Sequence, residues 1–96
     1  MIESFGDKGT EDLFHGRKTK RTRGFPADLL GTALRKLDMI NAAQNLEDLK
    51  APPANRLEAL KGSLKGYHSI RVNDQFRIVF RWSESKATEV RFTDYH

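Results

Sequence analysis

Apolar residues in the first half of the chain recur at helical spacing. Between positions 30 and 40 they lie three or four residues apart, which is typical of the buried stripe of an amphipathic helix. The stripe consists of Leu30, Ala33, Leu34, Leu37 and Ile40. Pro26 suits the first turn of this helix, which is predicted to run to about Ala43. A shorter helix is predicted to follow Thr10 as its N-cap, and Pro52-Pro53 stops any helix beyond.

In the second half the spacing changes to an alternation of apolar and polar positions, which is typical of strands with one buried face. The alternating runs contain Leu57 and Ala59, Ile70 and Val72, Phe76 to Trp82, and Val90 and Phe92. Short connections rich in Gly, Asn, Asp and Ser separate these runs, so consecutive strands are expected to pair antiparallel. Residues 1–5 form a possible further strand. We therefore predict one α+β domain over residues 1–96, with an antiparallel sheet of four to five strands and two N-terminal helices packed on one face.

The turn at Asn73 and Asp74 decides which side chains share a face of the sheet. A two-residue loop places apolar and charged residues on the same face, whereas a three-residue loop over 73–75 pairs Ile70 with Ile78. Because a shift of one residue turns every side chain to the other face, burial favours the three-residue loop. The opposite face then carries Tyr67, Ser69, Arg71, Arg77, Val79 and Arg81.

In this register Arg71 lies directly opposite Arg77. Like charges paired across two strands destabilise a sheet by roughly 0.2–1 kcal/mol. An anion bound between the two guanidinium groups would explain the pair. Two alternatives need no ligand: both side chains extend into solvent, or they contact Glu58 or Glu89 on flanking strands.

The charge balance agrees with an anionic partner. The chain has 17 basic and 13 acidic residues, a net charge of +4, which is compatible with binding to a polyanion. A run without any acid lies between positions 17 and 23, and its cations are Arg17, Lys18, Lys20, Arg21 and Arg23. Because like charges repel and do not pack, residues 16–24 are predicted to form a basic, mobile loop.

Several classes of protein are excluded by composition. No apolar run approaches the roughly 18–20 residues that a membrane helix needs, and the first residues resemble no signal peptide. The chain has no cysteine, and its three histidines do not lie at metal-ligand spacing. We expect a cytoplasmic protein with no membrane contact, no metal site and no cofactor.

The end of the chain carries groups that suit cleavage of RNA. Asp94, Tyr95 and His96 follow the last strand directly. A terminal triplet is also typical of a frayed end. Cleavage through the 2′-hydroxyl needs a base, cations for the developing phosphorane charge and an acid for the leaving 5′-oxygen. A carboxylate, a phenol and an imidazole beside an arginine-rich face provide these groups.

A basic, glycine-containing connection precedes the arginine-bearing strands. Residues 61–66 read KGSLKG, so that Lys61 and Lys65 are each followed by a glycine. The spacing is not that of a phosphate-binding P-loop. The segment either offers its ammonium groups to phosphate or is a plain turn.

These motifs together resemble the HigB toxins of the RelE/ParE superfamily. The resemblance rests on Leu60-Lys61-Gly62, on SIRVN at 69–73, on the alternation from Arg77 to Trp82 and on the terminal Asp94-Tyr95-His96. The opening IESF at 2–5 and the length also match, so the resemblance covers essentially the whole chain. It implies a RelE-like fold and a bacterial type II toxin that cuts mRNA in the aminoacyl site of the ribosome without a metal. It also implies neutralisation by a HigA-like helix-turn-helix antitoxin, and contact with operator DNA through that antitoxin.

Site residues follow from the same resemblance. The expected catalytic residues are Tyr95, His96, Asp94, Arg77, Arg71 and Lys61. Lys65, Arg81 and Arg56 are expected to bind RNA. Glu58 stands where some mRNA-cutting relatives carry a histidine, so it is either a base, a modulator that pairs with an arginine, or an anion that opposes RNA binding. The general base is therefore Tyr95, His96 or Glu58, and the run over 17–23 either contacts ribosomal RNA or is simply solvated.

Two functions other than RNA cleavage remain open. A ParE-like toxin poisons gyrase by binding it, although the terminal Asp94-Tyr95-His96 argues against this class. A toxin with decayed activity would remain as an antitoxin-binding partner, and Glu58 is the feature that favours it.

Overall fold

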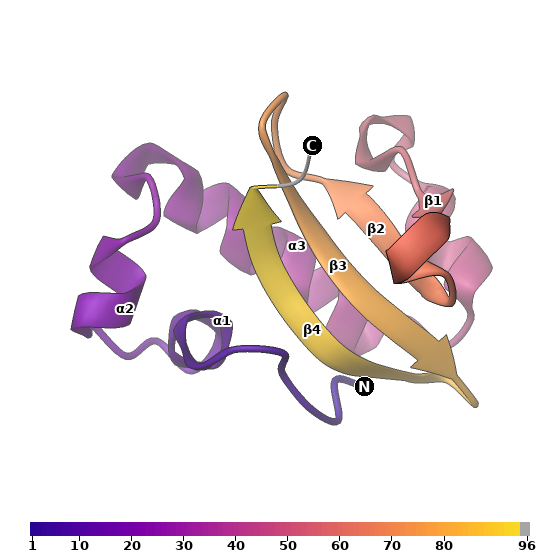
Figure 1. Ribbon diagram of the computed structural model, residues 1–96, viewed down its shortest axis with the longest axis horizontal. Coiled ribbons are helices and arrows are strands. Elements are labelled where there is room, and N and C mark those ends of the chain that lie inside the picture. Colours follow the sequence, from indigo (N-terminus) through magenta and orange to yellow (C-terminus); the bar gives the residue numbers. More distant parts are fainter. Residues whose placement is uncertain (95–96) are drawn as a thin grey trace.

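The computed structural model describes residues 1–94 and contains the expected antiparallel sheet. Its strands are β1 (Glu58–Ala59), β2 (Tyr67–Arg71), β3 (Phe76–Ser83) and β4 (Lys86–Asp94), paired in the order β1-β2-β3-β4. Figure 1 shows this sheet strongly twisted, with β4 beside the N-terminal segment. The α+β fold class with a four-stranded sheet is confirmed.

Helices cover one face of the sheet and one of its edges. The α-helices are α1 (Lys8–Phe14), α2 (Lys20–Arg23) and α3 (Leu30–Ala42). Short 3-10 turns connect the other elements: Ala27–Leu29, Leu46–Lys50, Pro53–Asn55 and Gly62–Leu64. In Figure 1, α3 lies behind the sheet, while α1 and α2 lie on the side of β4. Among residues 1–94, no helix has the length and apolar character needed to cross a membrane.

The core lies between α3 and the inner face of the sheet. Ala33, Leu37 and Ile40 of the predicted stripe are fully buried, as its helical spacing requires. They meet an inner sheet face that consists of Ile70, Ile78, Phe80, Val90 and Phe92. Leu30 and Leu34, at the edge of the stripe, are only half-buried.

The predicted register between β2 and β3 is confirmed. Ile70 pairs with Ile78 and Arg71 with Arg77, across a loop over 73–75. The Asn73 side-chain oxygen fixes this turn, because it accepts hydrogen bonds from the backbone N–H groups of Gln75 (2.9 Å) and Phe76 (2.7 Å). The arginines therefore lie on the sheet face that α3 leaves uncovered.

The pairing of β3 with β4 contains a bulge that sequence did not predict. Val79 pairs with Arg91 and Arg81 with Thr88, so two residues of β4 lie opposite Phe80. One of them, Glu89, has a left-handed φ of 53°. Such bulges bend a strand and redirect side chains, and this one places the Glu89 carboxylate near Tyr67.

Two expectations about the N-terminal region are wrong. Residues 1–5 form no regular strand; they make isolated parallel bridges at Ile2 and Phe5 to β4. The N-cap of α1 is Asp7, whose carboxylate accepts a hydrogen bond from the Thr10 N–H at 2.7 Å. Thr10 is instead buried, and its hydroxyl accepts a hydrogen bond from the N–H of Phe92 at 2.8 Å.

Residues 20–23 of the basic run form α2, so the prediction that residues 16–24 form a loop is wrong for this part. Thr19 caps this turn and Thr22 is buried. The like charges are tolerated because Asp12 of α1 pairs with Arg17 at 3.5 Å and with Arg21 at 3.2 Å. The Thr19 hydroxyl, followed by the two guanidiniums, lowers the pKa of Asp12 despite the opposing effect of burial. Sequence missed this because Asp12 lies in the preceding helix.

Candidate active site

The uncovered face of the sheet holds Arg77 rigidly. Its side chain is 12% exposed. One terminal nitrogen donates to the Ser69 hydroxyl at 3.0 Å, and the other to the Arg56 carbonyl at 3.4 Å and to the Glu58 carboxylate at 3.5 Å. A guanidinium fixed in this way is preorganised to stabilise negative charge.

Arg71 lies beside Arg77 and shares a hollow with it. The hollow has a volume of about 220 Å³ and is lined by Arg56, Glu58, Arg71, Asn73, Asp74 and Arg77. Asp74 pairs with Arg71, as Glu58 does with Arg77. Three arginines against two carboxylates leave a net positive charge, so the hollow attracts an anion such as a phosphate.

The structure confirms one of the sequence alternatives for the arginine pair, contact with a flanking carboxylate. Glu58 does contact Arg77, as one alternative expected, and a polar hollow lies between the side chains. Asn73 and Asp74 also line the hollow, although the sequence pattern predicted them only as turn residues. Their position next to Arg71 is the sequence feature that indicates this role, because a short side chain in a tight turn folds back over the end of the strand.

A second hollow adjoins the first on the same sheet face. Its volume is about 170 Å³, and its lining consists of Leu64, Tyr67, Val79, Arg91, Thr93 and Asp94. Asp94 accepts a hydrogen bond from the Gln75 side chain at 2.9 Å. Of the terminal triplet, Asp94 is thus placed beside the arginine face. Tyr95 and His96 lie outside the described residues.

Tyr67, Arg81 and Glu89 form a cluster at the far end of this face. The Tyr67 hydroxyl donates to Glu89 at 2.8 Å. The Arg81 guanidinium lies 4.8 Å from the centre of the Tyr67 ring, and its Nε is 3.8 Å from Glu89. Arg81, expected to bind RNA, lines neither of the two hollows.

The structure leaves the other predicted cations outside the two hollows. Lys61 and Lys65 flank the 3-10 turn Gly62–Leu64 and are exposed, and neither lines a hollow of this face. The cations of residues 17–23 lie still farther away: α2 is on the opposite side of the molecule from β1 in Figure 1. The structure therefore brings together Arg56, Glu58, Arg71 and Arg77, with Asp94 in the adjoining hollow.

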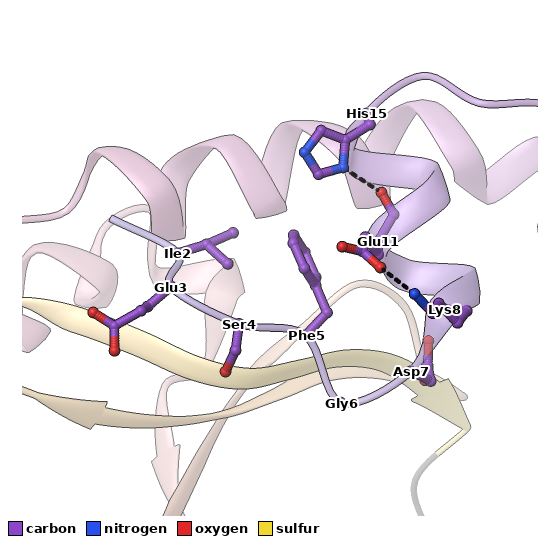
Figure 2. Close-up of a pocket in the computed structure, with 9 residues that line it drawn as sticks. All are labelled: Ile2, Glu3, Ser4, Phe5, Gly6, Asp7, Lys8, Glu11 and His15. Carbon is purple, nitrogen blue, oxygen red and sulfur yellow. Dashed lines mark hydrogen bonds and ion pairs between the residues drawn. The ribbon is translucent and has the colours of Figure 1, made fainter.

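A larger hollow, of about 600 Å³, lies along the N-terminal segment and α1 (Figure 2). Its charged residues are mostly acidic: Glu3, Asp7 and Glu11 against Lys8. Lys8 pairs with Glu11 at 3.4 Å, as the dashed line in Figure 2 shows. An excess of carboxylates repels phosphate, so this hollow is not the candidate anion site despite its larger volume.

Metal-assisted chemistry would need a cluster of ligands. Within the described part of the chain, no group of three or more His, Cys, Asp or Glu residues is arranged to hold a metal ion.

Comparison with known proteins identifies the family. Residues 3–96 match the model of the HigB-like toxins, described as the RelE-like toxin of the type II toxin–antitoxin system HigB. The protein belongs to this family. This HigB-like chain is therefore a type II toxin, a class defined by an antitoxin partner.

Individual relatives agree with this assignment. The chain is 42% identical over 87 residues to Toxin HigB-1 of Vibrio cholerae, covering 91% of this chain and 90% of that toxin. It is 33% identical over 96 residues, the full length of both chains, to Endoribonuclease HigB of Proteus vulgaris. The YoeB–YefM complex of Staphylococcus aureus contains a similar fold, with a TM-score of 0.57 at 16% identity over 100% of this chain and 98% of that one.

Proposed function

We propose that this HigB-like toxin is a ribosome-dependent endoribonuclease that cuts mRNA in the aminoacyl site without a metal ion. The observation that carries the proposal is the pair Arg71 and Arg77, opposite each other on an uncovered sheet face and lining one hollow. The name of the Proteus vulgaris relative, Endoribonuclease HigB, supports the reaction class.

The reaction would proceed by attack of a 2′-hydroxyl on the adjacent phosphorus. The bond from the 2′-oxygen to phosphorus forms as the bond from phosphorus to the 5′-oxygen breaks, which gives a 2′,3′-cyclic phosphate and a 5′-hydroxyl. A base takes the proton of the 2′-hydroxyl and an acid protonates the leaving 5′-oxygen. Arg77 and Arg71 would stabilise the extra negative charge on the phosphorane oxygens.

The base is proposed to come from the terminal residues rather than from Glu58. The Glu58 carboxylate contacts the Arg77 guanidinium, at 3.5 Å, so its position suits holding that arginine. Tyr95 or His96 remains the proposed base, with Asp94 preceding them in the sequence. Lys61 and Lys65, which are exposed next to β2, are proposed to contact the RNA backbone from the rim.

The proposed partners follow from the family. A HigA-like helix-turn-helix antitoxin would neutralise the toxin and link it to operator DNA. The ribosome would present the mRNA, and the cations at 17–23 are proposed to touch ribosomal RNA.

Primer extension on a single mRNA tests the function. Purified toxin is incubated with the mRNA alone, and with ribosomes programmed at a defined codon, both at the Mg²⁺ concentration that ribosomes need. We expect a cut at the aminoacyl-site codon with ribosomes only. Absence of a cut by the folded protein would overturn the proposal in favour of a toxin that acts by binding, and the next assay would be for inhibition of gyrase.

A further inference from the structure

The hollow next to the arginine pair differs chemically from the phosphate site. Leu64, Tyr67 and Val79 give it an apolar floor, and Val79 is only 2% exposed. Arg91, Thr93 and Asp94 of β4 provide a polar edge. An apolar floor with a polar edge is the surface that a planar heterocycle needs, because its faces are apolar and its edge carries donors and acceptors.

The two hollows lie next to each other in the sheet. Thr93 is the direct cross-strand partner of Arg77, and Arg91 is the partner of Val79. Directly opposed residues on one sheet face have Cβ atoms about 4.5–5.5 Å apart. A ligand bound to Arg77 through a phosphate therefore reaches the second hollow with its next covalent groups.

Among the arginines that β2, β3 and β4 place on this face, Arg91 is the one that pairs with no carboxylate within residues 1–94. Arg71, Arg77 and Arg81 each pair with an acid, namely Asp74, Glu58 and Glu89. The Arg91 Nε is buried and has no hydrogen-bond partner among the described residues. A buried donor without an acceptor is destabilising, so the side chain gains if a ligand with acceptor groups reaches it and lets it rearrange.

Gly6 makes room for Arg91. A Cβ atom at residue 6 would lie 2.8 Å from the Arg91 Nε and 2.9 Å from the Glu89 carbonyl oxygen. Both distances are too short for a side chain to be accommodated without displacement. The N-terminal segment, which runs beside β4 in Figure 1, thus fixes where the arginine lies.

We propose that this hollow binds one unstacked nucleobase of the RNA, next to the phosphate held by Arg71 and Arg77. The proposal rests on the proposed function and adds a base subsite to it. Tyr67, Leu64 and Val79 contact the base, and Arg91 donates to acceptors on its edge, as arginine does with O6 and N7 of guanine. The Asp94 carboxylate at the rim disfavours a second phosphate here, and the volume of about 170 Å³ suits a single base.

A titration with non-cleavable RNA tests the subsite directly. The probes are a 2′-O-methyl trinucleotide with guanine at its centre and the same trinucleotide with an abasic centre. Nitrogen-15 spectra of the toxin report the arginine Nε–H groups. We expect Arg77 to shift with both probes, and Arg91 to shift only with the base-containing one. Equal shifts of Arg91 with both probes, or none with either, would overturn the base subsite.

Cleavage kinetics give a second test with matched variants. Arg91→Met keeps the length of the side chain and removes its donors, Arg91→Lys keeps the charge, and Arg35→Met on the surface of α3 serves as control. We expect Arg91→Met to weaken the preference between codons that differ at the base beside the cut by about tenfold to a hundredfold. Arg91→Lys should recover part of the preference, and Arg35→Met should keep it.

The two tests separate failure of the subsite from failure of the proposed function. If wild-type toxin cuts mRNA on the ribosome and Arg91→Met keeps the same codon preference, the subsite is wrong and the function stands. If wild-type toxin does not cut, the proposed function is wrong. Thermal unfolding of each variant excludes misfolding as the cause of a loss.

Discussion

The molecule has two basic regions, and they treat their charges differently. On the sheet, Arg71 and Arg77 lie side by side and line a hollow that faces solvent. Around α2, Arg17 and Arg21 turn to Asp12, a carboxylate that is almost fully buried. The run over 17–23 has the higher density of cations in sequence, yet part of its charge is used to hold two helices together. The density of cations alone therefore does not locate an anion site.

Removing the guanidinium that is fixed most firmly should have the largest effect. Arg77→Met is expected to lower the rate of mRNA cleavage on ribosomes about a hundredfold to a thousandfold, because it removes preorganised donors from the developing phosphorane. The control is Arg35→Met, which should keep the wild-type rate. A loss below about threefold would contradict the catalytic role of the arginine pair.

In the basic region around α2, loss of a charge should lower the stability of the fold. Asp12→Asn is expected to lower the melting temperature at neutral pH, because Arg17, Arg21 and Thr19 lose their charged partner.

The lowered pKa of Asp12 determines how the effect of this variant on the melting temperature depends on pH. Its ionised form stabilises the fold above the unfolded pKa of about 3.9, and this stabilisation is lost as the pH falls through the lower folded value. The difference in melting temperature between wild type and variant should therefore shrink below about pH 4. A constant difference across the titration would show that the charge of Asp12 is not what stabilises α2.

Variants of the remaining cations of the basic run distinguish a role in ribosome binding from a role in cleavage. The triple variant Lys18→Gln, Lys20→Gln and Arg23→Gln leaves both partners of Asp12 in place. If these cations touch ribosomal RNA, the KM for ribosomes rises several-fold and its salt dependence becomes shallower, by about one unit of slope for each lost phosphate contact. The rate at saturating ribosomes should stay unchanged. An unaltered KM would show that the run is only solvated.

The smallest effect is expected from Glu58→Gln. This change removes a negative charge from the phosphate hollow, where the Glu58 side chain is more than half exposed. Exposed ion pairs contribute about 0.2–1 kcal/mol, so the affinity for RNA should rise by no more than about fivefold. A loss of cleavage with unchanged RNA binding would instead show that Glu58 takes part in the reaction, either as the base or by holding Arg77.

The sequence predicted those parts of the fold that depend on local patterns. The stripe of α3 and the alternation in β2 and β3 were sufficient to predict these elements. Burial of Ile70 and Ile78 determined the register that places Arg71 opposite Arg77, and these two arginines are the central residues of the candidate site. The resemblance to HigB toxins then supplied the reaction and the family, and the family is confirmed.

The parts that sequence missed depend on contacts between distant segments. The bulge at Glu89 arises where β4 meets both β3 and the N-terminal segment: the Ser4 hydroxyl accepts a hydrogen bond from the Glu89 N–H at 2.9 Å. The place of Arg91 depends on Gly6. The folding of α2 depends on Asp12. Helical and strand periodicity cannot reveal these contacts, because they join residues of different elements.

The pairing of the N-terminal segment with β4 has a consequence for synthesis of the toxin. Backbone hydrogen bonds join Glu3 to Ala87 and Gly6 to Val90, each at 2.8 Å, so this early segment of the domain can pair only after the last strand has been made. Contacts of such long sequence separation form late. Until β4 is made, the edge of β3 has no neighbour, the bulge does not exist and the hollow over Val79 lacks its polar edge of Arg91, Thr93 and Asp94. If the toxin cuts mRNA as proposed, a nascent chain can do so only after β4 has been made.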